Sequence, residues 1–157
     1  MTEPSPRESA RQTPAAIGRP EAPPRLRMLA AEDNRTNQVL LAAMLEPLGV
    51  DLHIAADGLE ALERFRAGDF ELVLMDVQMP VMGGVEATRA IRALERAEGR
   101  RPIPILGISG NALSHQVEEY LAAGMTGFVA KPVSMATLIQ AVQSALVGAA
   151  PAARAAA

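Results

Sequence analysis

The chain alternates short apolar runs with stretches in which apolar residues recur every three or four positions. Runs of the first kind are typical of buried strands, and the second pattern is typical of amphipathic helices. The predicted strands are 26–31, 50–55, 72–76, 102–109 and 127–130. The residues expected to face inward from the helices that follow them are Val39, Leu40, Ala43, Met44 and Leu48; Leu59, Leu62 and Phe65; Val85, Thr88, Ile91 and Leu94; Val117, Tyr120 and Leu121; and Leu138, Val142 and Leu146.

Five successive strand–helix units predict a parallel sheet with right-handed crossovers and helices on both faces. The expected fold class is therefore α/β, a doubly wound sandwich. The helix predicted from about Thr36 contains Pro47 near its end and stops at Gly49, and the fourth helix stops at Gly124. In such a sheet all strands end at the same edge, which is where open α/β folds place their ligands.

The third strand is the most apolar and ends on an acid. Leu72 to Met75 is wholly apolar, which indicates burial on both faces, and Asp76 follows directly. Pro80 and the Gly83-Gly84 pair then force a loop. Asp76 could merely accept hydrogen bonds from local amides, as aspartates near turns often do. Whether it has only this local role or a chemical one depends on which residues lie beside it at the edge of the sheet.

Other strand ends are polar too. Glu32-Asp33, Ser109 and Lys131 each follow a predicted strand, so they converge with Asp76 on one rim. Clustered carboxylates repel one another and favour a bound cation, and all-oxygen ligands suit Mg²⁺. A carboxylate beside Mg²⁺ and a lysine can act as a nucleophile toward a phosphoryl group. The expected product is an aspartyl phosphate.

Composition removes several classes of function. The 157 residues contain no Cys, which excludes disulfides and thiolate sites, and a cytoplasmic location is the expectation. The net charge of −3 without a basic block argues against binding to nucleic acid or an anionic membrane. Residues 1–24 carry half of the twelve prolines and predict a disordered arm, and residues 148–157 predict an alanine-rich tail. One domain is expected between them, over residues 25–147.

The strand-end residues resemble the receiver domain of two-component response regulators, over about Leu26 to Val147. The resemblance is carried by the Glu32-Asp33 pair, the loop from Asp76 to Gly84, Ser109-Gly110-Asn111, and the stretch from Phe128 to Pro132. It implies a flavodoxin-like (βα)5 sheet in the order 2-1-3-4-5. It also implies a phosphorelay role, in which a histidine kinase or histidine-phosphotransfer protein donates the phosphoryl group.

The resemblance assigns roles to single residues. Asp76 is the implied phosphoacceptor, Asp33 a direct Mg²⁺ ligand, Glu32 a holder of metal-bound water, and Gln78 a ligand through its backbone carbonyl. Lys131 is the implied phosphate-binding lysine, and its bond to Pro132 is often cis in the family.

A second group of implied roles concerns switching. Ser109 matches the switch hydroxyl, Phe128 the aromatic residue whose rotamer reports the state, and Gln78 and Asn111 the positions that set the lifetime of the phosphate. Glu32, Gly83 and Gly110 depart from the commoner Asp, Asp and Ala, and Glu32 is a variant found in receivers of hybrid histidine kinases. These departures remove no catalytic group.

The expected protein is not an enzyme beyond its own phosphotransfer and autodephosphorylation. It passes the signal on by protein contact, without a DNA-binding output domain, through the face of its fourth helix, fifth strand and fifth helix. Two rivals fit less well. A haloacid-dehalogenase-type phosphatase requires a second acid two residues after its nucleophile, and this chain has Gln78 there. A nucleotide or flavin binder wants a glycine-rich loop where Glu32-Asp33-Asn34 stands.

Overall fold

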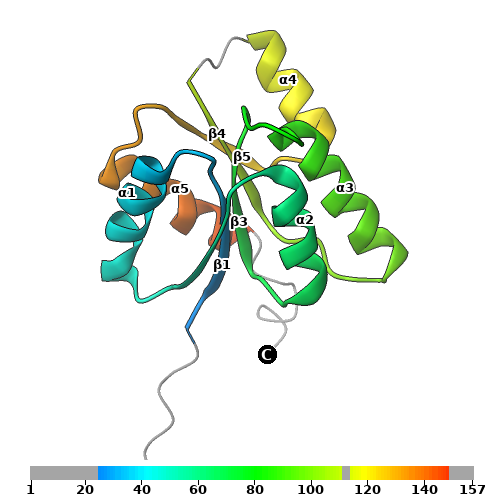
Figure 1. The fold of residues 1–157 in the computed structure, drawn as a ribbon, viewed down its shortest axis with the longest axis horizontal. Helices are drawn as coiled ribbons and strands as arrows, with labels where there is room; N and C mark the ends of the chain where they lie inside the picture. The colour runs from blue at the N-terminus through cyan, green and yellow to red at the C-terminus, as the bar shows by residue number, and fades with distance from the viewer. Residues whose placement is uncertain (1–24, 111–113, 149–157) are drawn as a thin grey trace, which may run out of the picture.

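The computed structural model describes residues 25–110 and 114–148. Its five strands form one parallel sheet in the order β2-β1-β3-β4-β5, which confirms the predicted order (Figure 1). The strands are β1 (Arg27–Ala31), β2 (Asp51–Ala55), β3 (Leu72–Asp76), β4 (Ile105–Ser109) and β5 (Gly127–Ala130).

The helices lie in two layers, one on each face of the sheet (Figure 1). They are α1 (Arg35–Leu45) with the short 3₁₀ helix η1 (Glu46–Leu48), α2 (Gly58–Ala67), α3 (Gly84–Ala97), α4 (Ser114–Ala123) and α5 (Met135–Gly148). Helices α1 and α5 cover one face, and α2, α3 and α4 contribute to the core on the other. Gly148 is thus the last residue of α5 and not the start of the predicted tail; residues 1–24 and 149–157 lie outside the described ranges.

The central strand β3 is buried along its whole length, as its sequence predicts. Val73 and Met75 point into the core under α2 and α3, whereas Leu72 and Leu74 point into the core under α1 and α5. Successive side chains of a strand point to opposite faces, so an uninterrupted apolar run is what a sheet covered on both sides requires. Full burial of each such side chain contributes about 1.5–3 kcal/mol.

Local capping sets where the first two helices begin. The Asn34 side chain accepts a hydrogen bond from the Asn37 amide (3.2 Å) at the start of α1. At the start of α2, Asp57 accepts from the Glu60 amide (2.8 Å), and Glu60 in return accepts from the Ala56 amide (2.9 Å). In α2 the two bonds resemble a capping box, with Glu60 accepting from the residue just before the N-cap Asp57. The caps Asn34 and Asp57 start both helices at the edge where the strands end.

Some of the predicted inward-facing residues are wrong. Val39, Leu40, Ala43, Leu48, Leu59 and Leu121 are exposed, whereas Leu41 and Leu45 face the core from α1. The segment from Val39 to Leu45 is apolar on every side, so its spacing does not determine which face packs. Strand β4 also begins later than predicted, at Ile105, because Pro102 and Pro104 lack the amide that a sheet interior needs.

Candidate functional site

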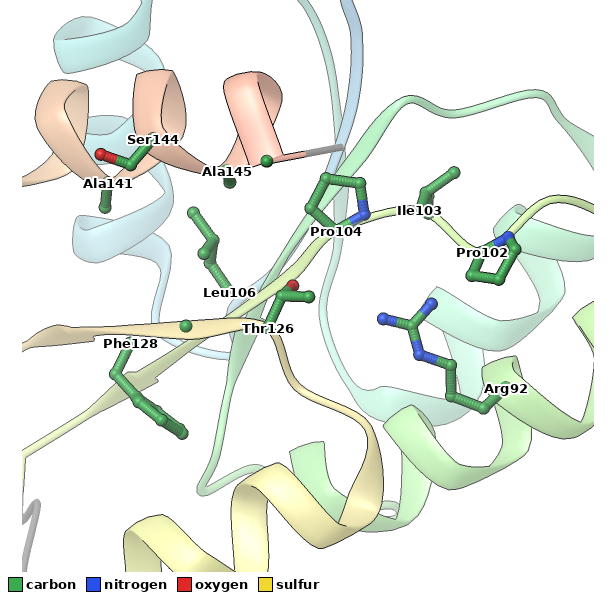
Figure 2. Close-up of a pocket in the computed structure, with 12 residues that line it drawn as sticks. Arg92, Pro102, Ile103, Pro104, Leu106, Thr126, Phe128, Ala141, Ser144 and Ala145 are labelled. Atoms are coloured by element: carbon green, nitrogen blue, oxygen red, sulfur yellow. The ribbon is translucent and has the colours of Figure 1, made fainter. Parts of the chain in front are cut away.

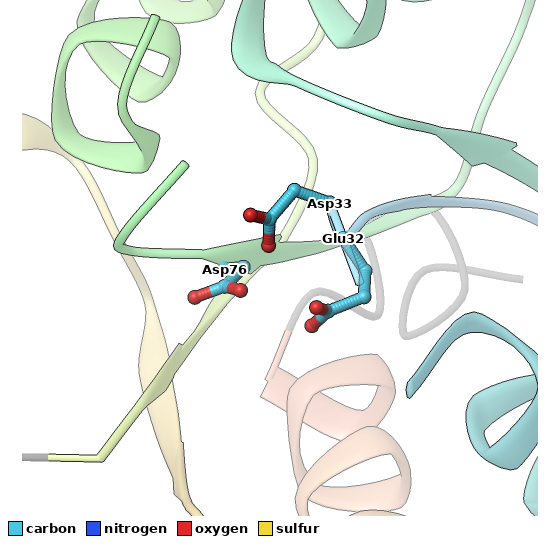
Figure 3. Close-up of side chains that lie close together, drawn as sticks. All are labelled: Glu32, Asp33 and Asp76. Carbon is cyan, nitrogen blue, oxygen red and sulfur yellow. The ribbon is translucent and has the colours of Figure 1, made fainter. Parts of the chain in front are cut away.

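Three carboxylates meet where β1 and β3 end. Glu32, Asp33 and Asp76 each place an oxygen within 4.8 Å of the other two (Figure 3). Glu32 and Asp76 are each 1% exposed, whereas Asp33 lies in solvent. The parallel pairing of β1 with β3 brings together acids more than forty positions apart in the sequence. The geometry therefore agrees with the convergence expected from the strand ends.

Both carboxylate oxygens of Asp76 accept hydrogen bonds. The Gln78 amide donates to Oδ1 (3.1 Å), and Lys131 Nζ donates to Oδ2 (3.0 Å). Lys131 follows the end of β5, and its amide donates to the Ser109 carbonyl (2.9 Å) at the end of β4. The Lys131–Pro132 peptide bond is cis. Asp76 is thus held between a local amide and a lysine from the edge strand, which fixes the direction of its carboxylate.

The loop after Asp76 follows a tight path. Gly84 packs against the Asp76 backbone so closely that a Cβ there would overlap the Asp76 carbonyl oxygen. Val81 has a φ of +67°, which strains a β-branched residue, and the Met82 amide reaches back across it to the Pro80 carbonyl (2.7 Å). The result is a tightly turned loop with the exposed Val81 side chain on the rim.

Amides from the first turn of α1 support Glu32. The Asn34 amide (3.0 Å) and Asn37 Nδ2 (3.2 Å) both donate to Glu32 Oε1, and Gln38 Nε2 donates to the Glu32 carbonyl (2.7 Å). We did not predict these supporting residues from the sequence. Their signal was the presence of three amide side chains, Asn34, Asn37 and Gln38, within five residues of Asp33, which suits a structural role around a buried acid.

The site is short of positive charge. Burial raises the pKa of Glu32; the Asn34 amide opposes this shift, and the nearby Asp76 carboxylate adds to it. Lys131 Nζ is 3.9 Å from Glu32 Oε2 and also lowers that pKa, but it is one ammonium against three acids. The side chains of this cluster offer only oxygen ligands, and Mg²⁺ is a cation that binds well to oxygen ligands alone.

Ser109 and Phe128 lie near the acids but not among them. Ser109 is buried at the end of β4, where it pairs with Ala130 of β5. Phe128 is half-buried and packs on Tyr120 of α4, with ring centroids 5.4 Å apart. Gly107 lies under this ring, and a Cβ there would come within 3.2 Å of it. Asn111, predicted to tune the lifetime of the phosphate, is outside the described residues.

Comparison with known proteins identifies the family in which this sequence pattern occurs. Residues 28–143 match the family model described as the response regulator receiver domain. The chain is 36% identical over 128 residues to the sensor protein GacS of Pseudomonas syringae pv. syringae, a match that covers 82% of this chain and 14% of GacS. It spans only 7 to 26% of the length of the first three sequence relatives.

Similar solved structures are receiver domains as well. The receiver domain of the sensor histidine kinase PA1611 from Pseudomonas aeruginosa, with a magnesium ion coordinated in its active-site cleft, is 36% identical (TM-score 0.70; 78% of this chain and 98% of that chain covered). The receiver domain of the response regulator Ssk1 from Saccharomyces cerevisiae, co-crystallised with the histidine phosphotransfer protein Ypd1, is 27% identical (TM-score 0.74; 78% and 89% covered). The fold, the matched residues and these relatives together show that the chain belongs to the response regulator receiver domains of two-component signalling.

Proposed function

We propose that this receiver accepts a phosphoryl group on Asp76 from the phosphohistidine of a histidine kinase or histidine-phosphotransfer protein. The observation that carries this proposal is the Asp76 carboxylate, buried and held 3.0 Å from Lys131 Nζ with two further acids within 4.8 Å. Beyond its own phosphotransfer and autodephosphorylation it catalyses no reaction. It signals by protein contact, in a cytoplasmic location.

In the transfer step an Asp76 oxygen attacks the phosphorus of the phosphohistidine. The P–N bond breaks, and its electron pair leaves on the imidazole nitrogen, which takes a proton from solvent. The Gln78 amide and Lys131 Nζ fix the carboxylate before attack, so little reorganisation accompanies the reaction. Lys131 also neutralises charge on the phosphoryl oxygens.

The acid cluster supports a role for Mg²⁺. When bound, Mg²⁺ would supply positive charge against the oxygens of the transferring group. Asp33 and Asp76 would bind it directly, Glu32 would hold metal-bound water, and Gln78 would contribute its backbone carbonyl. The magnesium-bound relative supports this assignment. Asn34 and Asn37 keep the Glu32 carboxylate in place by hydrogen bonding, which fits the support that metal ligands commonly receive.

The phosphodonor would dock beside this site, on α1. Val39 and Leu40 are 64% and 49% exposed on its outer face. Next to them a hollow of about 140 Å³ runs between α1 and the turn after β5, and Leu40, Glu32 and Lys131 are among the residues that line it. An apolar side chain of the partner entering this hollow would sit beside Glu32 and beside Lys131, whose ammonium contacts the acceptor Asp76. The co-crystal of a receiver with a phosphotransfer protein supports a protein partner.

The signal would leave through another face. Ser109 would turn toward the phosphoryl oxygens, and Phe128 would respond by changing rotamer, which alters the surface of α4, β5 and α5. The exposed Leu121 of α4 offers a contact point for a downstream protein on that surface. Gln78 and Asn111 would set how long the phosphate lasts, and alanine at both positions should change the dephosphorylation rate.

The test is transfer from acetyl phosphate, followed by intact mass and peptide mapping. Wild type should gain one phosphoryl group only when Mg²⁺ is present, and Asp76→Asn should gain none. Asp69→Asn, which alters an exposed acid in the loop before β3, should behave as wild type. Labelling of Asp76→Asn to the wild-type extent, or full labelling in excess chelator, would refute the proposal.

A further inference from the structure

Helix α4 is attached to the rest of the domain mainly through its carboxyl-terminal half. Tyr120 and Ala123 are buried there, and Met125 just beyond the helix is buried as well. In the amino-terminal half His115, Glu118 and Glu119 are exposed, and Gln116 and Val117 are partly buried. That half lies next in sequence to the end of β4, where Ser109 sits. The two ends of one helix therefore differ in how much packing a movement would disturb.

The helix ends in a backbone motif built on Gly124. The Gly124 amide donates to the Leu121 carbonyl (3.0 Å), and the Met125 amide donates to the Tyr120 carbonyl (3.1 Å), the two bonds of a Schellman motif. Gly124 has a φ of +112°, which disfavours any side chain, and a Cβ there would come within 2.8 Å of Arg92 Cγ. This motif leaves the carbonyl oxygen of Gly124 directed at α3.

An arginine of α3 holds that carbonyl oxygen with two hydrogen bonds. Arg92 Nε (3.0 Å) and Nη2 (2.8 Å) both donate to it, across 32 positions of sequence. Arg92 Nη1 donates to Glu95 Oε1 (2.7 Å), and Glu95 Oε2 accepts the Ile103 amide (2.9 Å). The side chains are only 13% and 2% exposed. A largely buried charged pair that is hydrogen-bonded at both ends resists displacement, because breaking it leaves Glu95 as an unpaired buried charge.

The other side of this contact is open. A hollow of about 520 Å³ separates the start of β5 from the second half of α5, which presents the small residues Ala141, Ser144 and Ala145 (Figure 2). Arg92 reaches toward the mouth of this hollow from α3 (Figure 2). Helix α5 thus leaves space beside the turn from α4 to β5. Helix α3 holds the same turn from the other side, through the contact of Arg92 with Gly124.

We propose that Arg92 and Glu95 form a fixed pivot for α4. The pair holds the carboxyl-terminal end, so a displacement that begins at Ser109 tilts the amino-terminal end and does not shift the helix as a whole. Translation of the entire helix would break the bonds to Gly124 and unpack Tyr120 and Met125. Tilting disturbs the amino-terminal half, which is the less buried one. The trigger rests on the proposed phosphorylation of Asp76, but the pivot itself is a property of the unmodified protein.

Hydrogen exchange read by NMR tests the pivot in the unmodified chain. Arg92→Met should raise exchange of the Gly124 and Met125 amides at least tenfold, because the turn loses its anchor. Arg89→Met, which alters an exposed arginine one turn earlier in α3, should leave both amides within twofold of wild type. If Arg92→Met also leaves them within twofold, no pivot exists.

A second variant covers the case in which Arg92→Met does not fold. Arg92→Met with Glu95→Gln removes both charges and keeps an amide oxygen for Ile103, and the same tenfold criterion applies to it. With Mg²⁺ and beryllofluoride, wild type should change exchange over residues 114–119 and keep that of 120–125, whereas the variant should change both. Equal changes over both ranges in wild type would overturn the pivot. Acetyl phosphate labelling of Asp76, measured in parallel, reports separately on the proposed function.

Discussion

Replacement of Glu32 by glutamine should stabilise the metal-free protein at neutral pH. Glu32 is a buried acid whose pKa is raised chiefly by burial. A group with a raised pKa in the folded state stabilises the fold fully below its unfolded pKa and loses that contribution as the pH rises through the raised value. Above that window the wild type carries the cost of a buried charge. Glutamine has the same shape and no charge, so it avoids this cost.

The magnitude follows from opposing terms that leave a net cost. With an effective dielectric constant of about 20, repulsion from Asp76 within 4.8 Å costs roughly 3.5 kcal/mol, and the exposed, better-screened Asp33 at a similar distance adds to it, whereas attraction to Lys131 at 3.9 Å returns roughly 4 kcal/mol. What remains is desolvation of the carboxylate, several kcal/mol per ion, reduced by its charge-assisted bonds from Asn34 and Asn37. Glutamine keeps an acceptor for both donors. We expect the free energy of unfolding to rise by about 1–2 kcal/mol.

Urea unfolding from pH 4 to 8 in excess chelator measures this difference. The gain of Glu32→Gln over wild type should grow as the pH rises, and Glu63→Gln, an exposed glutamate of α2, should show no such trend. With Mg²⁺ tenfold above its dissociation constant the wild type should gain about 1.4 kcal/mol, and the variant less. A variant less stable than wild type in chelator, or parallel pH profiles, would show that burial of this charge is not costly.

Two further substitutions probe the surroundings of the site. Gly84→Ala should reduce labelling of Asp76 by acetyl phosphate at least tenfold, because its Cβ would overlap the Asp76 carbonyl; Gly83→Ala meets its nearest atom at 3.5 Å and should label normally, and equal labelling would contradict the packing argument. Arg100→Ala should lower the free energy of unfolding by about 2 kcal/mol, because its guanidinium caps the last carbonyls of α2; the exposed Arg101 is the control, and urea midpoints decide.

Sequence reasoning succeeded where a local pattern determines the outcome. Four apolar residues before Asp76 require a strand covered on both faces, and parallel strands necessarily end at one edge. The strand ends that carry Glu32, Asp33 and Asp76 therefore fall on one rim, which is why an acid cluster could be predicted there. That β1 lies directly beside β3 came from the resemblance to receiver domains and not from the residue pattern.

It failed where several arrangements satisfy the same pattern. In α1, Val39 and Leu40 fit the three-to-four spacing as well as Leu41 and Leu45 do, and only packing against β1 and α5 selects between them. The contact of Arg92 with Gly124 was equally out of reach, because it joins residues 32 positions apart through the crossing of two helices. Such contacts depend on distances that periodicity does not encode.

The strand order has a consequence for how the domain is assembled during translation. With the order β2-β1-β3-β4-β5, each strand after the first finds a partner that the ribosome has already released. The three acids are complete once β3 is made, whereas Lys131 follows β5, the last strand. A nascent chain thus holds its carboxylates together before their ammonium partner arrives. By reducing the repulsion between these carboxylates before Lys131 is synthesised, cellular magnesium would raise the folding yield in addition to its proposed role in phosphotransfer.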